Sequence, residues 1–492
     1  MKDSHTVVAN VIVLFVKQLA TWGLTTVLFL FAPRYLGDEG FGQITFASSF
    51  TGLFVVLILL GVPTYLVKEV ARDRTQLGAF FFNSLMMRIP LSAMVFLIVF
   101  LSVNLMGYSP QTQMVVYLGC VTTILLCIND TASSLLQGIE NMAWLSVAEV
   151  VGKLVVTGAG IFVLINGQGV VIYALVLLIG MSINLAINLS YFFVRIRVKP
   201  ELDLAVWRSL LVGGLPFLLT SIMATLYQRM DATILRFLTT EAVVGWYGAA
   251  AQLLGSLNFV PILVATAVLP ALSRMHAANP RRLTMAARKS LSMIIAVSLP
   301  MMVGTVLLSD KIIEFLRFPE AFQNSVPLLA ILAIDLPLTG TLVVIGTVVI
   351  AQDKQRQWAI LTAVSVAVNL VMNLIGIPLA QELYGNGAIG AAAASVVSEA
   401  FQMLLAVRML PGGILDRSVL QVFAKSVVAS VLMGIVVWYT RGLEILVVVT
   451  LGIVVYCLVS LITKSIENED LMLVRDVILK RRMAVNGIRE VA

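Results

Sequence analysis

The sequence is a succession of long apolar segments whose pattern recurs about 200 residues further along the chain. Residues 16–72 pass through an apolar segment, the triplet Arg34–Leu36, a short acidic turn and a second apolar segment. Residues 218–274 repeat this order, with the triplet Arg236–Leu238 and a turn that contains Glu241. Internal repeats of membrane spans are typical of transporters whose two halves rock about a central site. The repeat therefore predicts a transporter built from two related halves.

The composition requires lipid as the solvent for most of the chain. Of its 492 residues, 60% are hydrophobic and 12% are charged, and the mean hydropathy is +1.00. Soluble domains are about half apolar and about one quarter charged. Apolar segments of about 20 residues, long enough to cross the hydrocarbon core, recur along the whole chain. We therefore predict an all-α integral membrane protein.

We predict about 14 transmembrane helices, arranged as two pseudo-symmetric six-helix bundles and two extra C-terminal helices. The spans are expected near residues 7–32, 43–62, 80–106, 113–136, 143–166, 169–194, 209–236, 243–272, 284–309, 322–350, 358–381, 387–409, 419–440 and 442–463. The predicted domains are the N-terminal bundle (1–200), the C-terminal bundle (201–410), helices 13 and 14 (411–464) and a cytoplasmic tail (465–492).

The net charge of +7 fits a membrane topology better than a nucleic-acid partner. If the N-terminus is cytoplasmic, roughly 24 Lys and Arg side chains fall on cytoplasmic segments and about 5 fall outside. The opposite orientation would invert this ratio. We therefore expect both termini to be cytoplasmic and no nucleic acid to bind.

The sequence lacks the motifs of the common catalytic and metal sites. It contains no GxxxxGK[ST] phosphate loop, no HExxH and no CxxC. His5 and His276 are both predicted in cytoplasmic segments, and Cys120, Cys127 and Cys457 lie in predicted spans without metal-ligand spacing. We expect no enzyme, no cofactor and no bound metal, so that an ion gradient or the substrate gradient supplies the energy.

Charged side chains inside the membrane are functional candidates, because they are costly unless they face a cavity or a partner. Lys17 lies near the middle of the first span, and Arg229 and Asp231 lie in the seventh. Side chains two residues apart project to nearly opposite sides of a helix. We predict that Lys17 and Arg229 line a substrate cavity and that Asp231 has a structural role against a neighbouring helix.

Two further pairs are predicted to be structural. Glu149 and Lys153 are spaced i, i+4 in the fifth span, with the acid first, which favours an ion pair within the helix. Asn369 and Asn373 have the same spacing in the eleventh span, and we expect them to hydrogen-bond between helices.

Three acids are candidates for ion coupling: Asp335, Glu399 and Asp130. Asp335 lies just before Pro337, and proline bends a helix because it removes a backbone donor. A proton or Na⁺ that neutralises a buried carboxylate would favour one packing of the two halves over the other. Arg88, which opens the third predicted span, is interpreted as a charge that sets topology.

Several stretches resemble signatures of the oligosaccharide flippases. They are LPFLLTSIMATLYQRMDATIL (Leu215–Leu235), VVGWYGAAAQL (Val243–Leu253), VLPALSR (Val268–Arg274), APRYLGDEGFG (Ala32–Gly42), LVKEVAR (Leu66–Arg72) and LLQGIENM (Leu135–Met142). The chain is similar in this respect to the polysaccharide-transport branch, including Wzx-type O-antigen flippases, of the multidrug/oligosaccharidyl-lipid/polysaccharide (MOP) exporter superfamily. The resemblance extends over essentially the whole chain.

The resemblance implies a substrate and a location. The substrate would be an undecaprenyl-diphosphate-linked oligosaccharide, moved across the bacterial inner membrane for a surface polysaccharide such as the O-antigen of lipopolysaccharide. It also implies membrane lipids, a polysaccharide polymerase and glycosyltransferases as partners. Lys17 and Arg229 come from equivalent spans of the two halves, where a cavity for the diphosphate is expected.

Three other functions stay open. A lipid II flippase of peptidoglycan synthesis also carries a diphosphate lipid, although the Ala32–Gly42 pattern differs. A multidrug and toxin extrusion antiporter shares the fold, but its cationic substrates favour an acidic cavity. A non-transporting scaffold of a polysaccharide synthesis complex would need no charged cavity at all.

Overall fold

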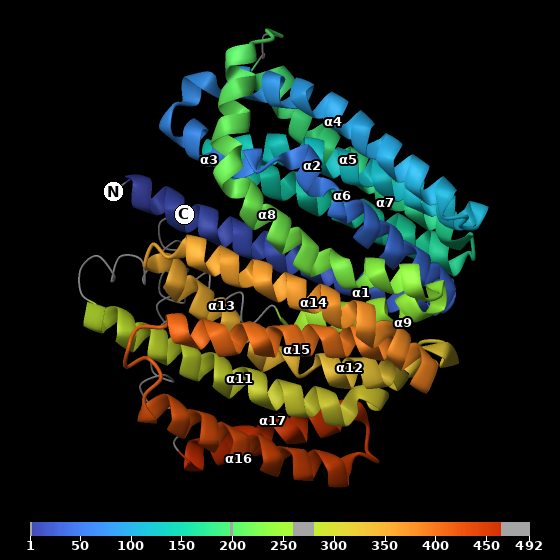
Figure 1. The fold of residues 1–492 in the computed structure, drawn as a ribbon, viewed down its shortest axis with the longest axis vertical. Coiled ribbons are helices and arrows are strands. Elements are labelled where there is room, and N and C mark those ends of the chain that lie inside the picture. The colour runs from blue at the N-terminus through green and yellow to red at the C-terminus, as the bar shows by residue number, and fades with distance from the viewer. Residues whose placement is uncertain (1, 197–199, 259–279, 464–492) are drawn as a thin grey trace, which may run out of the picture. The chain divides into compact units, whose positions relative to one another are not determined.

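The structure, a computed structural model, describes residues 2–196, 200–258 and 280–463, and every element in this described part is a helix (Figure 1). The chain forms two compact units. Unit 1 comprises Met1–Gln252, Leu316–Leu328 and Thr362–Ser398, and unit 2 comprises Leu253–Phe315, Leu329–Leu361 and Glu399–Ala492. The division that we predicted between bundles 1–200 and 201–410 stays a prediction.

The first helix, α1 (Lys2–Leu53), is broken at Gly37. This residue has φ 69° and ψ −177°, a backbone conformation that glycine adopts without the strain of a side chain. A straight helix of 52 residues would be about 78 Å long, whereas the hydrocarbon core is about 30 Å thick. The break lies in the turn predicted between residues 32 and 43, and it separates α1 into two helical arms.

The other helices of unit 1 follow α1 along the chain. They are α2 (Val55–Leu59), α3 (Val62–Arg72), η1 (Arg74–Gln76), α4 (Leu77–Leu105), α5 (Pro110–Gly138), α6 (Met142–Ile165), α7 (Gly169–Ser190), the π-helical turn η2 (Tyr191–Ile196), α8 (Leu204–Leu238), α9 (Glu241–Leu257) and η3 (Glu320–Ser325). Helix α1 packs against α5, α6 and α8, and α5 also packs against α4 and α7 (Figure 1).

Polar caps fix where several of these helices begin. The Ser109 hydroxyl accepts a hydrogen bond from the Thr112 N–H, and Pro110 occupies the first turn of α5. The Asn141 side chain accepts from the Trp144 N–H at the start of α6. The first N–H groups of a helix have no partner within it, and lipid offers none. The caps therefore fix the first residues of these spans at polar turns.

The side chains divide between packed and lipid-facing surfaces. Within unit 1, Phe81 and Phe192 are buried and stack with their ring centroids 4.1 Å apart. Large apolar side chains such as Leu105, Leu154 and Phe162 are exposed on the outside of their helices. Exposed apolar surface of this extent is typical of helices that contact hydrocarbon.

In unit 2, the helices α11 (Pro280–Phe315), α16 (Arg417–Thr440) and α17 (Ile445–Ile462) pack against one another. It also contains α13 (Asp335–Ala351), which packs on α11, and the short turn η4 (Val407–Met409). The helices α12 (Val326–Leu332), α14 (Gln355–Tyr384) and α15 (Ala388–Ala406) contribute residues to both units, as does the end of α9.

The span predicted at residues 322–350 is broken. Its segments Glu320–Leu332 and Asp335–Ala351 are bent by 44° relative to each other. Asp335 is the first residue of α13 and Pro337 lies in its first turn, where proline cannot continue the preceding hydrogen-bond ladder. The bend that we predicted beside Asp335 and Pro337 is therefore present.

By length and composition, the described part of the chain contains 11 candidate membrane spans, or 12 if the bent pair counts as one. We predicted about 14. Two of the predicted spans fall in the single run Val13–Leu59, and α9 (17 residues) covers the span predicted at 243–272 only as far as Leu257. The rest of that span and the predicted tail (465–492) lie outside the described residues.

Candidate functional site

A cavity of about 360 Å³ lies within unit 1, lined by α1, α5, α7 and α8. Hydroxyl groups of Ser48, Thr122 and Thr123 are part of its lining. Arg229 of α8 is the one charged lining residue in the described part of the chain. Gly52 leaves room for it, because a Cβ at that position would lie 3.1 Å from Nε of Arg229.

The Arg229 guanidinium can bind an anion. Its side chain is exposed, and no acidic side chain among the described residues forms an ion pair with it. An unpaired cation in a membrane span is tolerated where it faces water or an anionic ligand. The planar guanidinium presents two parallel donors that match a phosphate oxygen pair. The cavity therefore combines one positive charge with neutral hydroxyl groups.

Lys17 has a different environment. Its Nζ lies 2.8 Å from Oε2 of Glu149 in α6, and the two side chains are 14% and 34% exposed. The ion pair seen for Glu149 thus joins two helices, whereas we predicted a pair with Lys153 of the same helix. Lys153 is half-buried, and its pairing stays a prediction. Lys17 is not among the lining residues of the Arg229 cavity, so the cavity brings only one of the two predicted cations to its surface.

Asp231 is the centre of a buried polar cluster. Its carboxylate is 9% exposed and accepts hydrogen bonds from Tyr247 Oη (3.0 Å), Asn373 Nδ2 (2.7 Å) and Ser395 Oγ (2.7 Å). These donors come from α9, α14 and α15, so the carboxylate on α8 is hydrogen-bonded to three other helices through residues of unit 1. Arg229 and Asp231 therefore face different surroundings, as their spacing in the sequence predicts.

The predicted amide pair belongs to the same cluster. Asn373 Nδ2 lies 2.9 Å from Oδ1 of Asn369, and Asn369 Nδ2 donates to Ser398 Oγ at 3.3 Å. The two asparagines are 3% and 0% exposed. Hydrogen bonds from buried amides join helices in a solvent that offers no substitutes. The structural role that we predicted for Asn369, Asn373 and Asp231 rests on these contacts.

Two of the predicted coupling acids belong to unit 2 and come from two different helices. Asp335 is 4% exposed at the start of α13, and Glu399 is 7% exposed in α15. Glu399 Oε2 accepts a 2.6 Å hydrogen bond from Thr339, which lies one turn after Asp335. The bend in front of α13 is therefore adjacent to both carboxylates.

The third predicted coupling acid, Asp130, is half-buried on α5 and interacts electrostatically with Arg88 of α4. Arg88 is fully buried, and its Nη1 donates to the backbone carbonyl of Cys127. Our interpretation of Arg88 as a topology charge stays a prediction; the structure shows that protein encloses its guanidinium.

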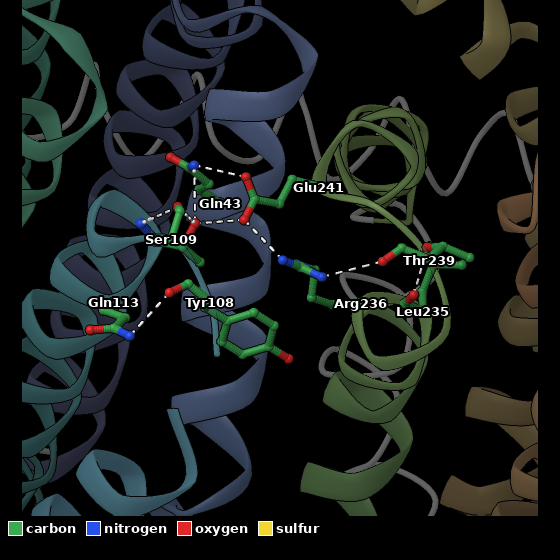
Figure 2. A network of polar contacts seen from close by, with 9 residues as sticks. Gln43, Tyr108, Ser109, Gln113, Leu235, Arg236, Thr239 and Glu241 are labelled. Atoms are coloured by element: carbon green, nitrogen blue, oxygen red, sulfur yellow. Dashed lines mark hydrogen bonds and ion pairs between the residues drawn. The ribbon is translucent and has the colours of Figure 1, made fainter. Parts of the chain in front are cut away.

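The sequence reasoning missed a polar cluster at the end of unit 1 where α5 begins and α8 ends. Glu241 accepts hydrogen bonds from Gln43 Nε2 (2.8 Å), Thr112 Oγ1 (2.5 Å) and Arg236 Nη2 (3.0 Å) (Figure 2). The Arg236 guanidinium also lies over the ring of Tyr108, 4.4 Å from its centroid. We call Gln43, Thr112, Arg236 and Glu241 the Glu241 cluster.

Beside this cluster, α1 and α9 cross in backbone contact. A Cβ at Gly42 would collide with the carbonyl oxygen of Glu241, and a Cβ at Gly245 would collide with that of Asp38. Asp38 and Glu241, and likewise Gly42 and Gly245, are related by one offset in the internal repeat. The crossing is therefore reciprocal, as expected where equivalent segments of two related halves meet.

Two hydrogen bonds at this crossing are related to each other by the repeat in the same way. Gln43 donates to Glu241 at 2.8 Å, and Trp246 Nε1 donates to Asp38 Oδ2 at 3.0 Å. The repeat offset that relates Asp38 to Glu241 also relates Gln43 to Trp246. The signal that could have identified this site was the acidic turn present in both repeats.

Two protein families match the sequence. The family described as polysaccharide biosynthesis protein matches residues 7–276, and the family MatE matches residues 216–375. A curated relative, described as probable low-salt glycan biosynthesis flippase Agl15 of Haloferax volcanii, is 24% identical over 464 residues, which is 92% of this chain and 96% of the relative.

Solved structures share the fold. A lipid II flippase MurJ in an inward closed conformation superimposes with a TM-score of 0.74 at 16% identity, over 94% of this chain and 100% of that one. An inward-facing multidrug resistance MATE family transporter of the MOP superfamily gives a TM-score of 0.62 at 16% identity, over 81% and 98%. At these identities the likeness concerns the fold alone.

Proposed function

The chain belongs to the polysaccharide biosynthesis protein family of the MOP superfamily, and from this premise we propose that it is a flippase for a lipid-linked oligosaccharide. The substrate would be an undecaprenyl-diphosphate-linked oligosaccharide that moves from the inner to the outer leaflet of the inner membrane. Two six-helix halves, with 14 spans in total, would alternate about a central cavity. The product would serve a surface polysaccharide such as O-antigen, together with a polymerase and glycosyltransferases.

The observation that carries this proposal is the Arg229 cavity. A sugar-bearing diphosphate cannot cross hydrocarbon unaided, because each buried charge without a partner is costly. A single guanidinium among hydroxyl groups would replace water around the phosphate and the first sugar. A cavity whose one charge is positive disfavours the cationic substrates of a multidrug extruder, which is the reason to rank that function lower.

We assign Lys17 to a second phosphate contact. Its ammonium is paired with Glu149, so binding a phosphate there would exchange one anionic partner for another. Such an exchange gives the lysine an anionic partner both with and without substrate, whereas Arg229 has no acidic partner among the described residues until the substrate arrives.

The experiment that tests the function uses the purified chain in lipid vesicles. Three fluorescent lipids would be compared for transbilayer movement: an undecaprenyl-diphosphate-linked oligosaccharide, lipid II and a lipophilic cation. We expect rapid movement of the first. Movement of lipid II alone would favour the peptidoglycan function, movement of the cation alone would favour a multidrug antiporter, and no movement of any probe would favour a scaffold.

The proposed topology places both termini in the cytoplasm and residues 166–169, the turn between α6 and α7, outside. In a background without native cysteines, a membrane-impermeant thiol reagent added from outside should label Gln168→Cys and spare Arg281→Cys. The same reagent should label both positions after the membrane is made permeable. Labelling of position 281 in intact cells would reverse the orientation.

We propose that a proton or Na⁺ couples transport through Asp335 and Glu399. Both carboxylates are buried beside the bend before α13, so neutralising them would change which packing of that bend is favoured. Asp335→Asn and Glu399→Gln should therefore remove the response of flipping to an imposed ion gradient. Asp130→Asn tests the remaining candidate. Variants that respond to the gradient like the wild type would assign coupling to other residues.

A further inference from the structure

A second, smaller cavity lies in unit 1 beside the Glu241 cluster. It has a volume of about 240 Å³ and is lined by Tyr35, Glu39 and Gln43 of α1, by Gln111 of α5 and by the turn between α6 and α7. Tyr35, Glu39 and Gln111 are exposed, so the cavity is open to a ligand. It shares no lining residue with the Arg229 cavity.

Gln43 lines this cavity, and its buried amide oxygen has no hydrogen-bond partner among the described residues. Its side chain is 6% exposed, and its Nε2 donates to Glu241 at 2.8 Å and to Thr112 at 3.2 Å. Because a carboxylate only accepts hydrogen bonds, the amide nitrogen has to face Glu241, and the oxygen points away from it (Figure 2). Within the described part of the chain, this buried oxygen has no hydrogen-bond partner. A ligand that donates a hydrogen bond would remove the penalty of that lone acceptor.

The internal repeat shows that this acceptor is not needed for the α1–α9 crossing. The repeat equivalent of Gln43 is Trp246, which donates to Asp38 as Gln43 donates to Glu241. An indole N–H donates and has no acceptor. A donor alone therefore satisfies the equivalent contact, and the buried Gln43 oxygen is an additional group on a residue that lines the cavity.

We propose that this cavity binds one ring of a neutral saccharide. The lining mixes acceptors, at Gln43 and Glu39, with groups that both donate and accept, at Gln111 and Tyr35, and sugar hydroxyls also both donate and accept. The exposed Tyr35 ring offers an apolar face for a pyranose. The Glu39 carboxylate would repel phosphate. Drug-sized ligands fill about 300–1,000 Å³, so this cavity suits a single ring rather than a whole oligosaccharide.

The source of the saccharide rests on the proposed function. With the proposed topology, the cavity lies at the outer end of the molecule, where the oligosaccharide of a flipped lipid would leave the Arg229 cavity. Gln43 belongs both to this cavity and to the Glu241 cluster, so a bound sugar would contact the group that ties α1 to α9.

The test is saturation-transfer NMR on the full-length protein in nanodiscs, since detergents with sugar headgroups would compete. The probes are methyl glucoside, N-acetylglucosamine and rhamnose, with tetramethylammonium and inorganic phosphate as charged comparisons. We expect signal from at least one sugar, reduced several-fold by Tyr35→Ala and by Gln111→Ala. Neither substitution removes a buried side chain, so both variants should fold.

Two controls separate this cavity from the rest of the molecule. Tyr439→Ala removes a tyrosine that is 85% exposed on α16 and should leave sugar binding unchanged. Arg229→Ala should slow flipping strongly and leave sugar binding unchanged, so a failure of the proposed function is distinguishable from a failure of this site. Absent sugar signal, binding of tetramethylammonium in its place, or binding that survives both cavity substitutions would each overturn the proposal.

A second measurement identifies the source of the saccharide. If the cavity receives the transported glycan, Tyr35→Ala should slow flipping of a lipid with a long oligosaccharide more than that of a lipid with a single sugar. If the variant slows the two lipids by the same factor relative to the wild type, the cavity would be assigned to free sugars instead.

Discussion

Replacing Arg229 with alanine should slow flipping of a lipid-linked oligosaccharide by roughly 30- to 100-fold, which corresponds to about 2–3 kcal/mol of lost phosphate contact. Arg229 is the one charge on the cavity wall in the described part of the chain, so no other lining group replaces it. The measurement is the initial flipping rate in vesicles, normalised to the amount of folded protein.

Two matched variants test whether the effect comes from the donor geometry of Arg229 and whether it is specific to that position. Arg229→Lys keeps the charge but loses the two-donor geometry, so it should retain an intermediate rate. Arg417→Ala removes an exposed arginine at the start of α16 and should flip at the wild-type rate. Wild-type flipping by Arg229→Ala would show that the diphosphate is bound elsewhere.

Replacing Asp231 with asparagine should destabilise the protein by about 2–4 kcal/mol. The carboxylate accepts from Tyr247, Asn373 and Ser395. An amide offers one accepting oxygen and places an N–H₂ group against one of these donors. Lipid and packed helices provide no water to relieve the conflict. The measurement is the midpoint of thermal or denaturant unfolding of the solubilised protein.

The matched control for this substitution is Asp353→Asn. Asp353 is exposed in the turn after α13 and has φ 59°, a conformation that asparagine tolerates as well as aspartate. We expect the control to unfold within about 0.5 kcal/mol of the wild type. Ser395→Ala removes a single donor and should cost about 1 kcal/mol. Equal stability of Asp231→Asn and Asp353→Asn would contradict the structural role of Asp231.

The helices and their approximate ends were predictable from the sequence because lipid acts on local composition. A segment of about 20 apolar residues has to be helical in the bilayer, since only the helix satisfies its own backbone groups. The breaks at Gly37 and before Pro337 were also predictable from local sequence, because both residues interrupt the backbone hydrogen bonds of a helix. The family was also predictable from the motifs, and the match over residues 7–276 confirms it.

The partners of the charged groups were not predictable. Glu149 was expected to pair within its own helix, and nothing in the sequence indicated its contact with Lys17, which lies 132 residues away. Asp231 and Asn373 lie 142 residues apart, and each was assigned to a separate helix contact. Arg88 was placed near a membrane surface, whereas it is fully buried between helices.

The sequence by itself determined that this chain crosses the membrane many times and that its family is one of flippases rather than enzymes. The two related halves that its repeat predicts stay a prediction. Hydrophobic length and repeated motifs are local properties, and the free energy of transfer into lipid depends on them directly. Tertiary structure alone decided that Arg229 faces a cavity and that Asp231 hydrogen-bonds to three other helices. It also decided that, among the described residues, Arg229 has no acidic partner and the oxygen of Gln43 has no donor. Those outcomes depend on which helix faces meet, and each face is chosen by packing between segments far apart in the chain.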